Sequence, residues 1–284
     1  MHLIPSTPAT LELQQWLSDG ISRPNLAETA LLLAKIEYPE LNIINYMQRF
    51  EELANQVRQR IVHQSTPNMI IALNQVLFEQ EGFCGNIENY YDPKNSFLNE
   101  VLDRKTGIPI TLAIIYLEVG QRLGLPLKGI SFPGHFLVKL EMSAHSMLVL
   151  DPFSKGIPLS ETVLNQRLEE MQGKGRAGRI FLRQALQTAS QQDILIRMLR
   201  NLKDIYLRSE QWSKLLPIME QLLIINPDLS EEWRDRGMLY QRLECARAAV
   251  SDYERYLSIE PYAVDSDFIE EQINQLSNQI KRFH

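Results

Sequence analysis

The sequence is poor in cysteine, in cationic charge and in long apolar runs, and each shortage excludes a class of protein. Its 284 residues include only Cys84 and Cys245, far apart, so a disulfide framework and a cysteine-based zinc site are excluded. The net charge of −6 argues against sequence-independent nucleic-acid binding, which needs a basic face. No apolar run approaches the roughly 20 residues that span a bilayer, and no signal peptide is recognised. We expect a cytoplasmic protein that binds neither membrane nor nucleic acid.

What the sequence does contain is typical of a globular protein with two domains. Its hydrophobic content is 44% and its charged content 23%, and 284 residues suffice for two cores of ordinary size. Apolar residues at three-to-four spacing predict helices over most of residues 8–80. The predicted fold class is α+β and mostly helical, with an N-terminal helical subdomain over residues 1–80.

The stretch from Gly107 to Asp151 organises the chain. Its first part, GIPITLAIIYLEVGQRLGLP, predicts a buried helix, because apolar residues surround it almost completely. Pro109 suits the first turn of that helix, where a backbone N–H has no partner. Two β-like runs follow, and a hairpin turning near Ser143 would place His135 directly opposite Asp151. A histidine oriented by a carboxylate is the base half of a nucleophilic site.

These motifs resemble the transglutaminase-like branch of the papain-type fold. In that branch a Gly-x-Cys opens a buried helix, a histidine starts a strand and an aspartate lies on the next strand. Here Gly107-Ile108-Pro109 stands in place of Gly-x-Cys, so His135 and Asp151 match while the nucleophile does not.

More closely, three strings are similar to the SirB-type family: YYDPKNSFLNEVLDRKTGIPITL, FPGHFLVKL and LDPF. Those bacterial proteins carry a degenerate transglutaminase-like domain, usually followed by tetratricopeptide repeats. The resemblance implies a transglutaminase-like core, which we place at residues 81–178, and it implies no particular activity.

The missing nucleophile favours a non-catalytic core, since proline has no group that attacks a carbonyl. The alternative is a hydrolase or acyltransferase that uses His135 and Asp151 with a substitute nucleophile, either Cys84 or Thr111. A third interpretation is that the His–Asp pair only ties two strands together. His145 falls in the predicted turn and no His-x-x-x-His spacing exists, so we expect no metal and no other cofactor.

A cleft beside the start of the buried helix is the predicted place of any chemistry. The preceding segment, residues 82–96, is rich in glycine, asparagine and proline and predicts an irregular loop. Tyr90 and Tyr91 in this loop either cap the core beneath them or line the cleft. The cleft candidates are Tyr90, Tyr91, Asn99, Pro109 and Thr111. A second loop or linker is predicted at residues 172–179, with three glycines and three basic residues.

The last third of the chain contains an internal repeat. Tyr206 and Tyr240, Trp212 and Ala246, and Pro227 and Pro261 are each separated by 34 residues, the period of the tetratricopeptide unit. We therefore predict a repeat domain over residues 190–284, with repeats at 196–229 and 230–263 and a final capping helix.

The first helix of each repeat has a packed side and an opposite side that is rich in arginine. The groove candidates on this opposite side are Arg197, Arg200, Asn201, Arg208, Arg234 and Arg242. Arginine forks suit carboxylates, so the groove is predicted to bind an acidic segment of a protein or peptide. Two alternatives stay open: the arginines pair with Asp204 and Asp235, or the short array packs against the front domain. The function expected from the sequence is that of a protein–protein interaction or scaffold module.

Overall fold

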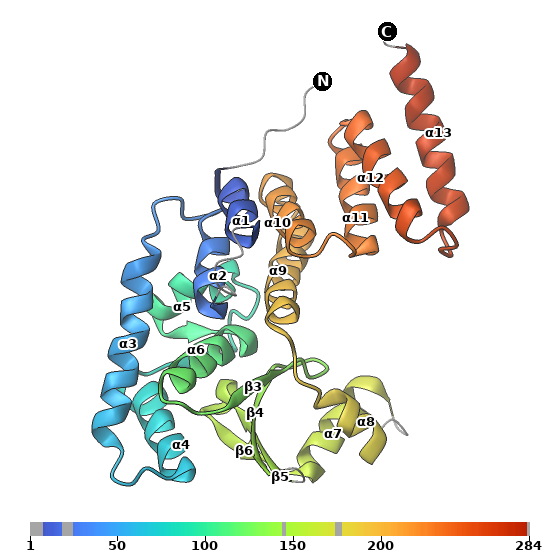
Figure 1. Ribbon diagram of the computed structural model, residues 1–284. Helices are drawn as coiled ribbons and strands as arrows, with labels where there is room; N and C mark the ends of the chain where they lie inside the picture. Colours follow the sequence, from blue (N-terminus) through green and yellow to red (C-terminus); the bar gives the residue numbers. More distant parts are fainter. Residues whose placement is uncertain (1–7, 19–24, 144–145, 174–177, 283–284) are drawn as a thin grey trace. The chain divides into compact units, whose positions relative to one another are not determined.

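The computed structural model describes residues 8–18, 25–143, 146–173 and 178–282 (Figure 1). By their contacts the residues form two compact units. We call residues 22–198 the core unit, and residues 1–21 together with 199–284 the repeat unit. Among the helices so described, none is long and apolar enough to cross a membrane. Residues 174–177 of the predicted loop at 172–179 lie outside the described part of the chain.

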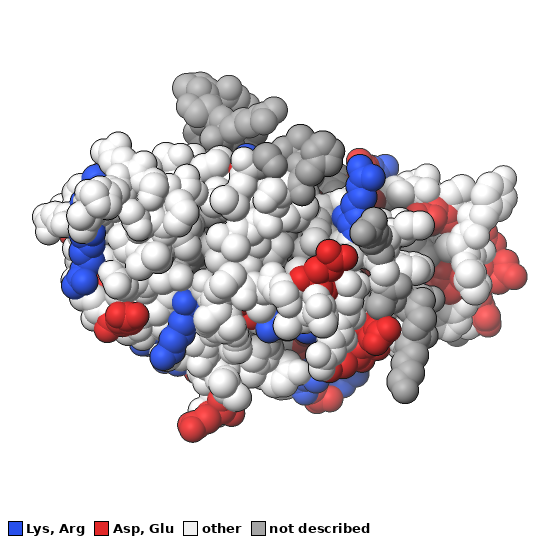
Figure 2. All heavy atoms as spheres, turned by 90° about the horizontal axis from the view of Figure 1, so that it is seen from below, with Lys and Arg blue, Asp and Glu red and all other residues white. Residues whose placement is uncertain are grey.

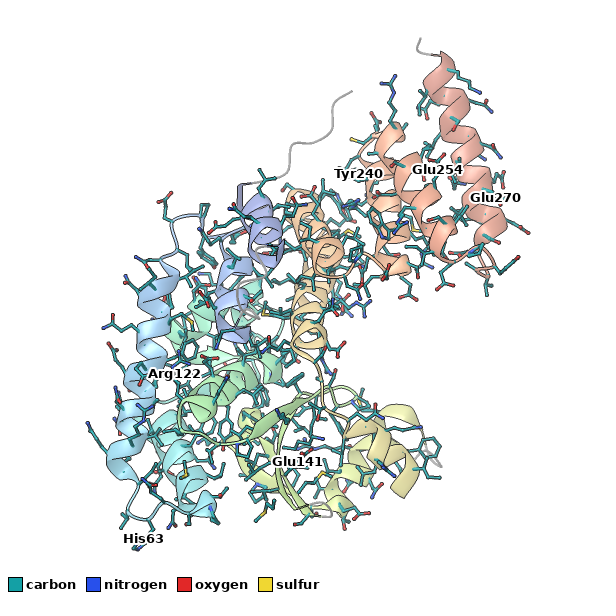
Figure 3. The ribbon with its side chains drawn as sticks, viewed as in Figure 1. His63, Arg122, Glu141, Tyr240, Glu254 and Glu270 are labelled. Carbon is teal, nitrogen blue, oxygen red and sulfur yellow. The ribbon has the colours of Figure 1, made fainter. Side chains whose placement is uncertain are left out.

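The core unit is organised around α6 (Pro109–Arg122), which is buried along nearly its whole length, as its sequence predicts. Its one buried charge, Glu118, pairs with Arg122 (labelled in Figure 3) and accepts a hydrogen bond from Asn25 Nδ2 at 3.0 Å. The helical elements that precede or surround α6 are α2 (Leu26–Ala34), α3 (Ile43–Arg60), α4 (Thr66–Asn74), the π-helix Gln75–Gln80, the 3-10 helix Pro93–Asn95 and α5 (Leu98–Arg104).

These helices do not form a separate subdomain over residues 1–80, because α2, α3 and α4 pack on α6. The first helix, α1 (Pro8–Ser18), instead packs on α10 (Trp212–Ile225), which belongs to the repeat unit.

A four-stranded antiparallel sheet packs against α6. Its strands, in spatial order, are β3 (Leu127–Ile130), β4 (Leu137–Ser143), β5 (Ser146–Asp151) and β6 (Ile157–Leu159). The other face is covered by α7 (Glu161–Gln172) and α8 (Arg179–Ala185), whose Leu164, Leu168 and Leu182 join Leu137 and Val149 in one buried cluster. Because Leu182 is needed to cover the sheet, the core unit continues past the predicted boundary at residue 178.

The register of the β4–β5 hairpin differs from the predicted one by two residues. Val138 pairs with Leu150, not with Leu148, and a register shift follows between Glu141 and Ser143. The strand also begins later than predicted, since Gly134, at a φ of +67°, turns the chain and leaves His135 in a bend before β4. A shift of two residues keeps every side chain on its face. His135 is therefore diagonal to Asp151 instead of directly opposite it.

The repeat unit consists of consecutive helices: α9 (Gln191–Arg208), α10 (Trp212–Ile225), α11 (Ser230–Arg242), α12 (Ala246–Ile259) and α13 (Ser266–Arg282). The pairs α9/α10 and α11/α12 fall where the 34-residue period predicts two repeats, and α13 follows as the predicted last helix. Gly237 allows α11 to approach α12 closely, because a Cβ there would lie 2.7 Å from the ring of Tyr253. The first eight residues of α9, 191–198, belong to the core unit.

Candidate functional site

His135 and Asp151 form the predicted pair, and the structure brings them together. The Nε2–H of His135 donates to Asp151 Oδ1 at 2.8 Å. The other ring nitrogen, Nδ1, is left for a second partner, as in a site where a histidine activates a nucleophile.

Asp151 has more partners than an orienting carboxylate requires. Its Oδ1 also accepts from the backbone N–H groups of Phe153 (3.1 Å) and Ser154 (3.3 Å), so it caps the 3-10 helix Pro152–Ser154. Its Oδ2 accepts from Ser154 Oγ at 3.0 Å and from Arg167 Nη1 at 3.1 Å.

The environment of Asp151 favours its ionised form. The side chain is 0% exposed, and burial alone would raise its pKa. The hydrogen bonds and charges of His135 and Arg167 outweigh that effect and hold the pKa of Asp151 below its ordinary value. The pair is therefore part of a hydrogen-bonded group of three residues, His135, Asp151 and Arg167, that also anchors the chain after β5.

A row of aromatic rings extends from the histidine to the loop before α5. The His135 ring meets Phe153 edge-on at 5.8 Å, Phe153 meets Tyr90 at 6.5 Å, and Tyr90 meets Tyr91 at 5.3 Å between centroids. Tyr90 is 37% and Tyr91 62% exposed, so neither caps the core. Burial raises the pKa of Tyr90, although Arg197 opposes the shift. Of the predicted cleft residues, the two tyrosines are the ones this row connects to His135.

Pro109, which the resemblance predicts in the place of the nucleophile, is the first residue of α6 and is buried. Thr111 is fully buried, and its hydroxyl donates to the Asn95 carbonyl at 2.8 Å while it accepts from the Ile108 N–H at 3.1 Å. It therefore closes the first turn of α6. Asn99, on α5, is buried as well, and its Oδ1 has no hydrogen-bond partner within the described chain.

Cys84 lies in β1 (Cys84–Gly85), which pairs in parallel with β2 (Thr106–Gly107) just before α6. A Cβ at Gly85 would meet the Phe153 ring at 2.3 Å, so that face of β1 looks toward the aromatic row. Successive side chains of a strand point to opposite faces. Cys84 therefore points away from Phe153, and its Sγ lies 3.7 Å from Thr106 Oγ1.

Three residues that hold the surroundings of His135 in place are not among the predicted cleft residues. Arg167 on α7 bonds Asp151, and the only hint of this in the sequence is its place next to the apolar Leu168, on the side of the helix expected to face the core. Asn95 is 0% exposed and donates to the carbonyls of Asn89 and Tyr90, so it fixes the tyrosine loop. Arg197, predicted as a groove residue, belongs to the core unit and donates to Ser131 Oγ and to the Phe132 carbonyl, which also accepts the His135 N–H.

The arginine-rich side of the repeats proves to be a ladder of alternating charges. Lys203 is buried and donates to Glu232 and Asp235, each at 2.6 Å. Arg200 bonds Glu232, while Arg234 bonds Asp235 and, at 3.1 Å, Asp265. Burial alone would lower the pKa of Lys203, but its two carboxylate partners raise it above the ordinary value.

Arg200 and Arg234 are thus not free, contrary to the first prediction, and the predicted pairing with Asp235 is present for Arg234. Arg200, Arg208 and Arg242 are the groove candidates whose side chains are exposed, and Asn201 is half-buried.

Beside this ladder the repeat unit contains a hollow of about 510 Å3. Its apolar lining includes Leu207, Trp212 and Met238, and its polar lining includes Arg242. The Arg242 guanidinium lies 4.4 Å from the Trp212 ring centre, and its contact with Glu210 is long, at 3.8 Å.

Charged side chains are few and scattered over much of the face drawn in Figure 2, and its lysines and arginines form no continuous basic patch. Within the described ranges, no cluster of three or more His, Cys, Asp or Glu side chains could hold a metal ion.

Comparison with known proteins agrees with this architecture. The Transglutaminase-like superfamily matches residues 44–200 and the Tetratricopeptide repeat family matches residues 202–274. A UPF0162 protein of Xylella fastidiosa is 38% identical over 91% of this chain and 92% of its own, and one of Vibrio cholerae is 34% identical over 89% and 93%. Protein SirB1 of Salmonella typhimurium is 25% identical over 87% and 90%. The chain therefore belongs to the transglutaminase-like family with tetratricopeptide repeats that includes the SirB1 and UPF0162 proteins.

Proposed function

We propose that this protein is a binding protein whose core unit has no transglutaminase or thiol-protease activity. The observation that carries the proposal is that Pro109 stands at the first position of α6, where the resemblance expects the nucleophile, while the His135–Asp151 pair is formed. Thr111 supports it, because its buried hydroxyl is already bonded on both sides. Cys84 supports it as well, since its strand directs the thiol away from the aromatic row.

The repeat unit is the proposed place of binding. Tetratricopeptide repeats generally mediate protein–protein interaction, and the hollow lined by Leu207, Trp212 and Met238 has the apolar floor that a partner's side chain needs. Arg242 lines this hollow and Arg208 is exposed on the same helix as Leu207, so an acidic segment of a protein is the proposed partner. The cytoplasm, where thiols stay reduced, is the proposed location, in agreement with two free cysteines.

Thiol labelling tests the catalytic half of the proposal. A cysteine-directed probe should label Cys84 at the rate of an ordinary exposed thiol, and His135→Ala should leave that rate unchanged. Cys245→Ser serves as the control that isolates Cys84. Fast labelling of Cys84 that disappears in His135→Ala would instead establish a cysteine-dependent hydrolase or acyltransferase.

Affinity capture tests the binding half. The charge reversal Arg208→Glu/Arg242→Glu should release proteins that the wild type retains from native lysate. The matched control, Lys94→Glu/Lys128→Glu, makes the same change in charge at exposed lysines of the core unit. If the groove variant and the control retain the same proteins as the wild type, with both folded by circular dichroism, the groove is not the binding site.

A further inference from the structure

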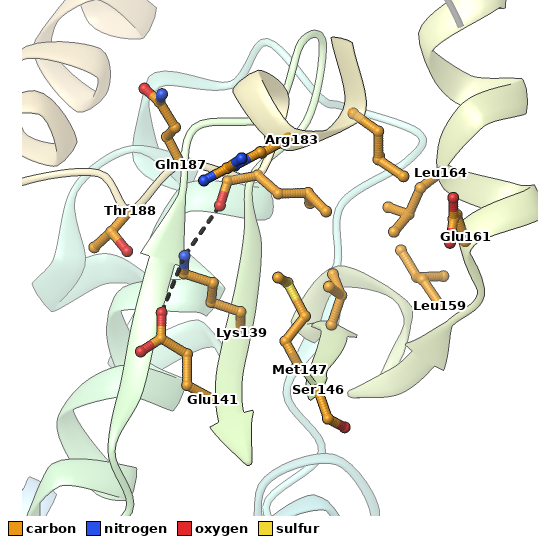
Figure 4. Close-up of a pocket in the computed structure, with 13 residues that line it drawn as sticks. Lys139, Glu141, Ser146, Met147, Leu159, Glu161, Leu164, Arg183, Gln187 and Thr188 are labelled. Atoms are coloured by element: carbon orange, nitrogen blue, oxygen red, sulfur yellow. Dashed lines mark hydrogen bonds and ion pairs between the residues drawn. The ribbon is translucent and has the colours of Figure 1, made fainter. Parts of the chain in front are cut away.

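The core unit contains a second, larger hollow that none of the preceding functions uses. It has a volume of about 840 Å3 and lies between the sheet and the α7–α8 segment (Figure 4). Sites for small molecules commonly enclose about 300–1,000 Å3. The segment after α8 closes one side, because Thr188 forms a β-bridge with Ile130 and Ala189 N–H donates to the Gly129 carbonyl at 2.9 Å.

The floor of this hollow is apolar. It consists of Val149 on β5, Leu159 on β6 and leucines of α7 and α8, among them Leu164 and Leu182. These residues continue the buried cluster that holds α7 and α8 to the sheet. A ligand that enters the hollow would therefore place an aliphatic part against leucine side chains, where burial of apolar surface favours binding.

A buried cation lies on the lining of the hollow, together with the apolar residues of its floor. Lys139 on β4 is 6% exposed, and its ammonium donates to the Leu186 carbonyl at 3.1 Å. Its second partner, Glu141, is 3.3 Å away and 59% exposed. An ammonium has three donors. Within the described residues one donor of Lys139 has no acceptor and can bond a ligand, and the exposed Glu141 carboxylate can be replaced by another anion.

A second cation lines the same hollow. Arg183 is exposed on α8, and among the described residues it has no carboxylate partner. Two acids, Glu141 and Glu161, also line the hollow. Their negative charge disfavours ligands that carry several negative charges. The arrangement of one uncommitted guanidinium and one spare ammonium donor above an apolar floor fits a single carboxylate that carries an aliphatic tail.

We propose that this hollow is a binding site for a small aliphatic monocarboxylate. The carboxylate bonds Lys139 and Arg183, and the tail lies against Leu159, Leu164 and Leu182. The site is built entirely within the core unit, so it is independent of peptide binding by the repeat unit.

Calorimetric titration of the full-length protein with sodium octanoate tests the site. Octanoate should bind saturably below its micellar concentration, and both 1-octanol and acetate should bind about tenfold more weakly or worse, because each lacks one half of the recognised structure. Equal binding of octanoate and 1-octanol, or no saturable binding of octanoate, overturns the proposal.

Variants place the binding in the hollow. Arg183→Ala and Lys139→Met should each weaken octanoate binding by about tenfold or more, since each removes a charged hydrogen-bond donor. Met147→Trp should block the hollow, which Met147 lines, while Met142→Trp on β4 makes the same change at an exposed methionine outside the lining. Should Lys139→Met not fold, Arg183→Ala and Met147→Trp decide. Undiminished binding in both of these, or equal loss in Met142→Trp, overturns the assignment.

Discussion

Replacing Asp151 by asparagine removes one negative charge from a fully buried side chain and changes its volume very little. In the variant, the amide oxygen can keep the place of Oδ1 and continue to accept from His135, Phe153 and Ser154. The amide NH2 then stands in the place of Oδ2, opposite Arg167 Nη1, which now lies 3.1 Å from Oδ2. Two donors face each other there, because arginine cannot accept a hydrogen bond.

The size of the loss follows from these contacts. Hydrogen bonds to charged groups contribute about 1.5–3 kcal/mol each, and a neutral amide keeps about half of that for His135. Arg167 is partly exposed, so its guanidinium can turn to water and its share falls at the lower end. We expect Asp151→Asn to reduce the free energy of unfolding by about 2–4 kcal/mol.

Urea denaturation followed by circular dichroism measures this loss as a lower midpoint at an unchanged slope. Glu169→Gln on α7 is the matched control, since it makes the same chemical change at an exposed carboxylate and should cost less than about 0.5 kcal/mol. An Asp151→Asn variant as stable as the Glu169→Gln control would refute the idea that the ionised carboxylate holds this region together.

Three further predictions concern pH and packing. Because the pKa of Asp151 is lowered on folding, its ionised form contributes stability above the unfolded-state value of about 3.9, and this contribution is lost as the pH falls through the folded-state value. The stability gap between wild type and Asp151→Asn should therefore narrow as the pH falls below about 4, and a gap that widens below about pH 4 contradicts this sign. Gly85→Ala should lower the free energy of unfolding by about 1–3 kcal/mol, because its Cβ would meet the Phe153 ring at 2.3 Å. Adding Phe153→Leu should recover part of this loss in a double-mutant cycle, and purely additive effects would show that the contact is unimportant. Lys203→Met should lower the free energy of unfolding, measured in urea, by about 3 kcal/mol, since it leaves Glu232 and Asp235 without their shared cation. The control Arg242→Met, at an exposed arginine, should lower it by less than about 0.5 kcal/mol, and equal losses would argue against a stabilising role of the Lys203 ion pairs.

The features that the sequence predicts well are those with a strict period or a strict steric requirement. The buried helix from Pro109 follows from apolar residues on all its sides, and the repeat helices follow from the 34-residue spacing. The proximity of His135 and Asp151 also follows, because a two-residue error in register leaves both side chains on the same face.

The rest depends on contacts between segments far apart in the chain, for which local patterns hold no signal. The turn at Gly134 and the irregularity after Glu141 set the true hairpin register. Spacing along one helix shows which side chains point outward but not which acids of a neighbouring helix they meet. It therefore predicts arginines without acidic partners. Arg200 and Arg234 pair with such acids, which the helix spacing does not reveal. Arg197 is a predicted groove residue, yet its partners, Ser131 and Phe132, precede it by more than 60 residues.

The boundary between the two units falls inside a helix, α9, and not in a loop. The division falls between Met198 and Leu199, within the helix, where each carbonyl accepts from an N–H one turn further on. A chain cut at that point would leave residues 191–198 as a piece of helix too short to persist in water by itself, and Arg197, which holds the carbonyl that also anchors the His135 turn, lies in that piece. Cutting the chain at this boundary is therefore expected to weaken the support of the turn that holds His135.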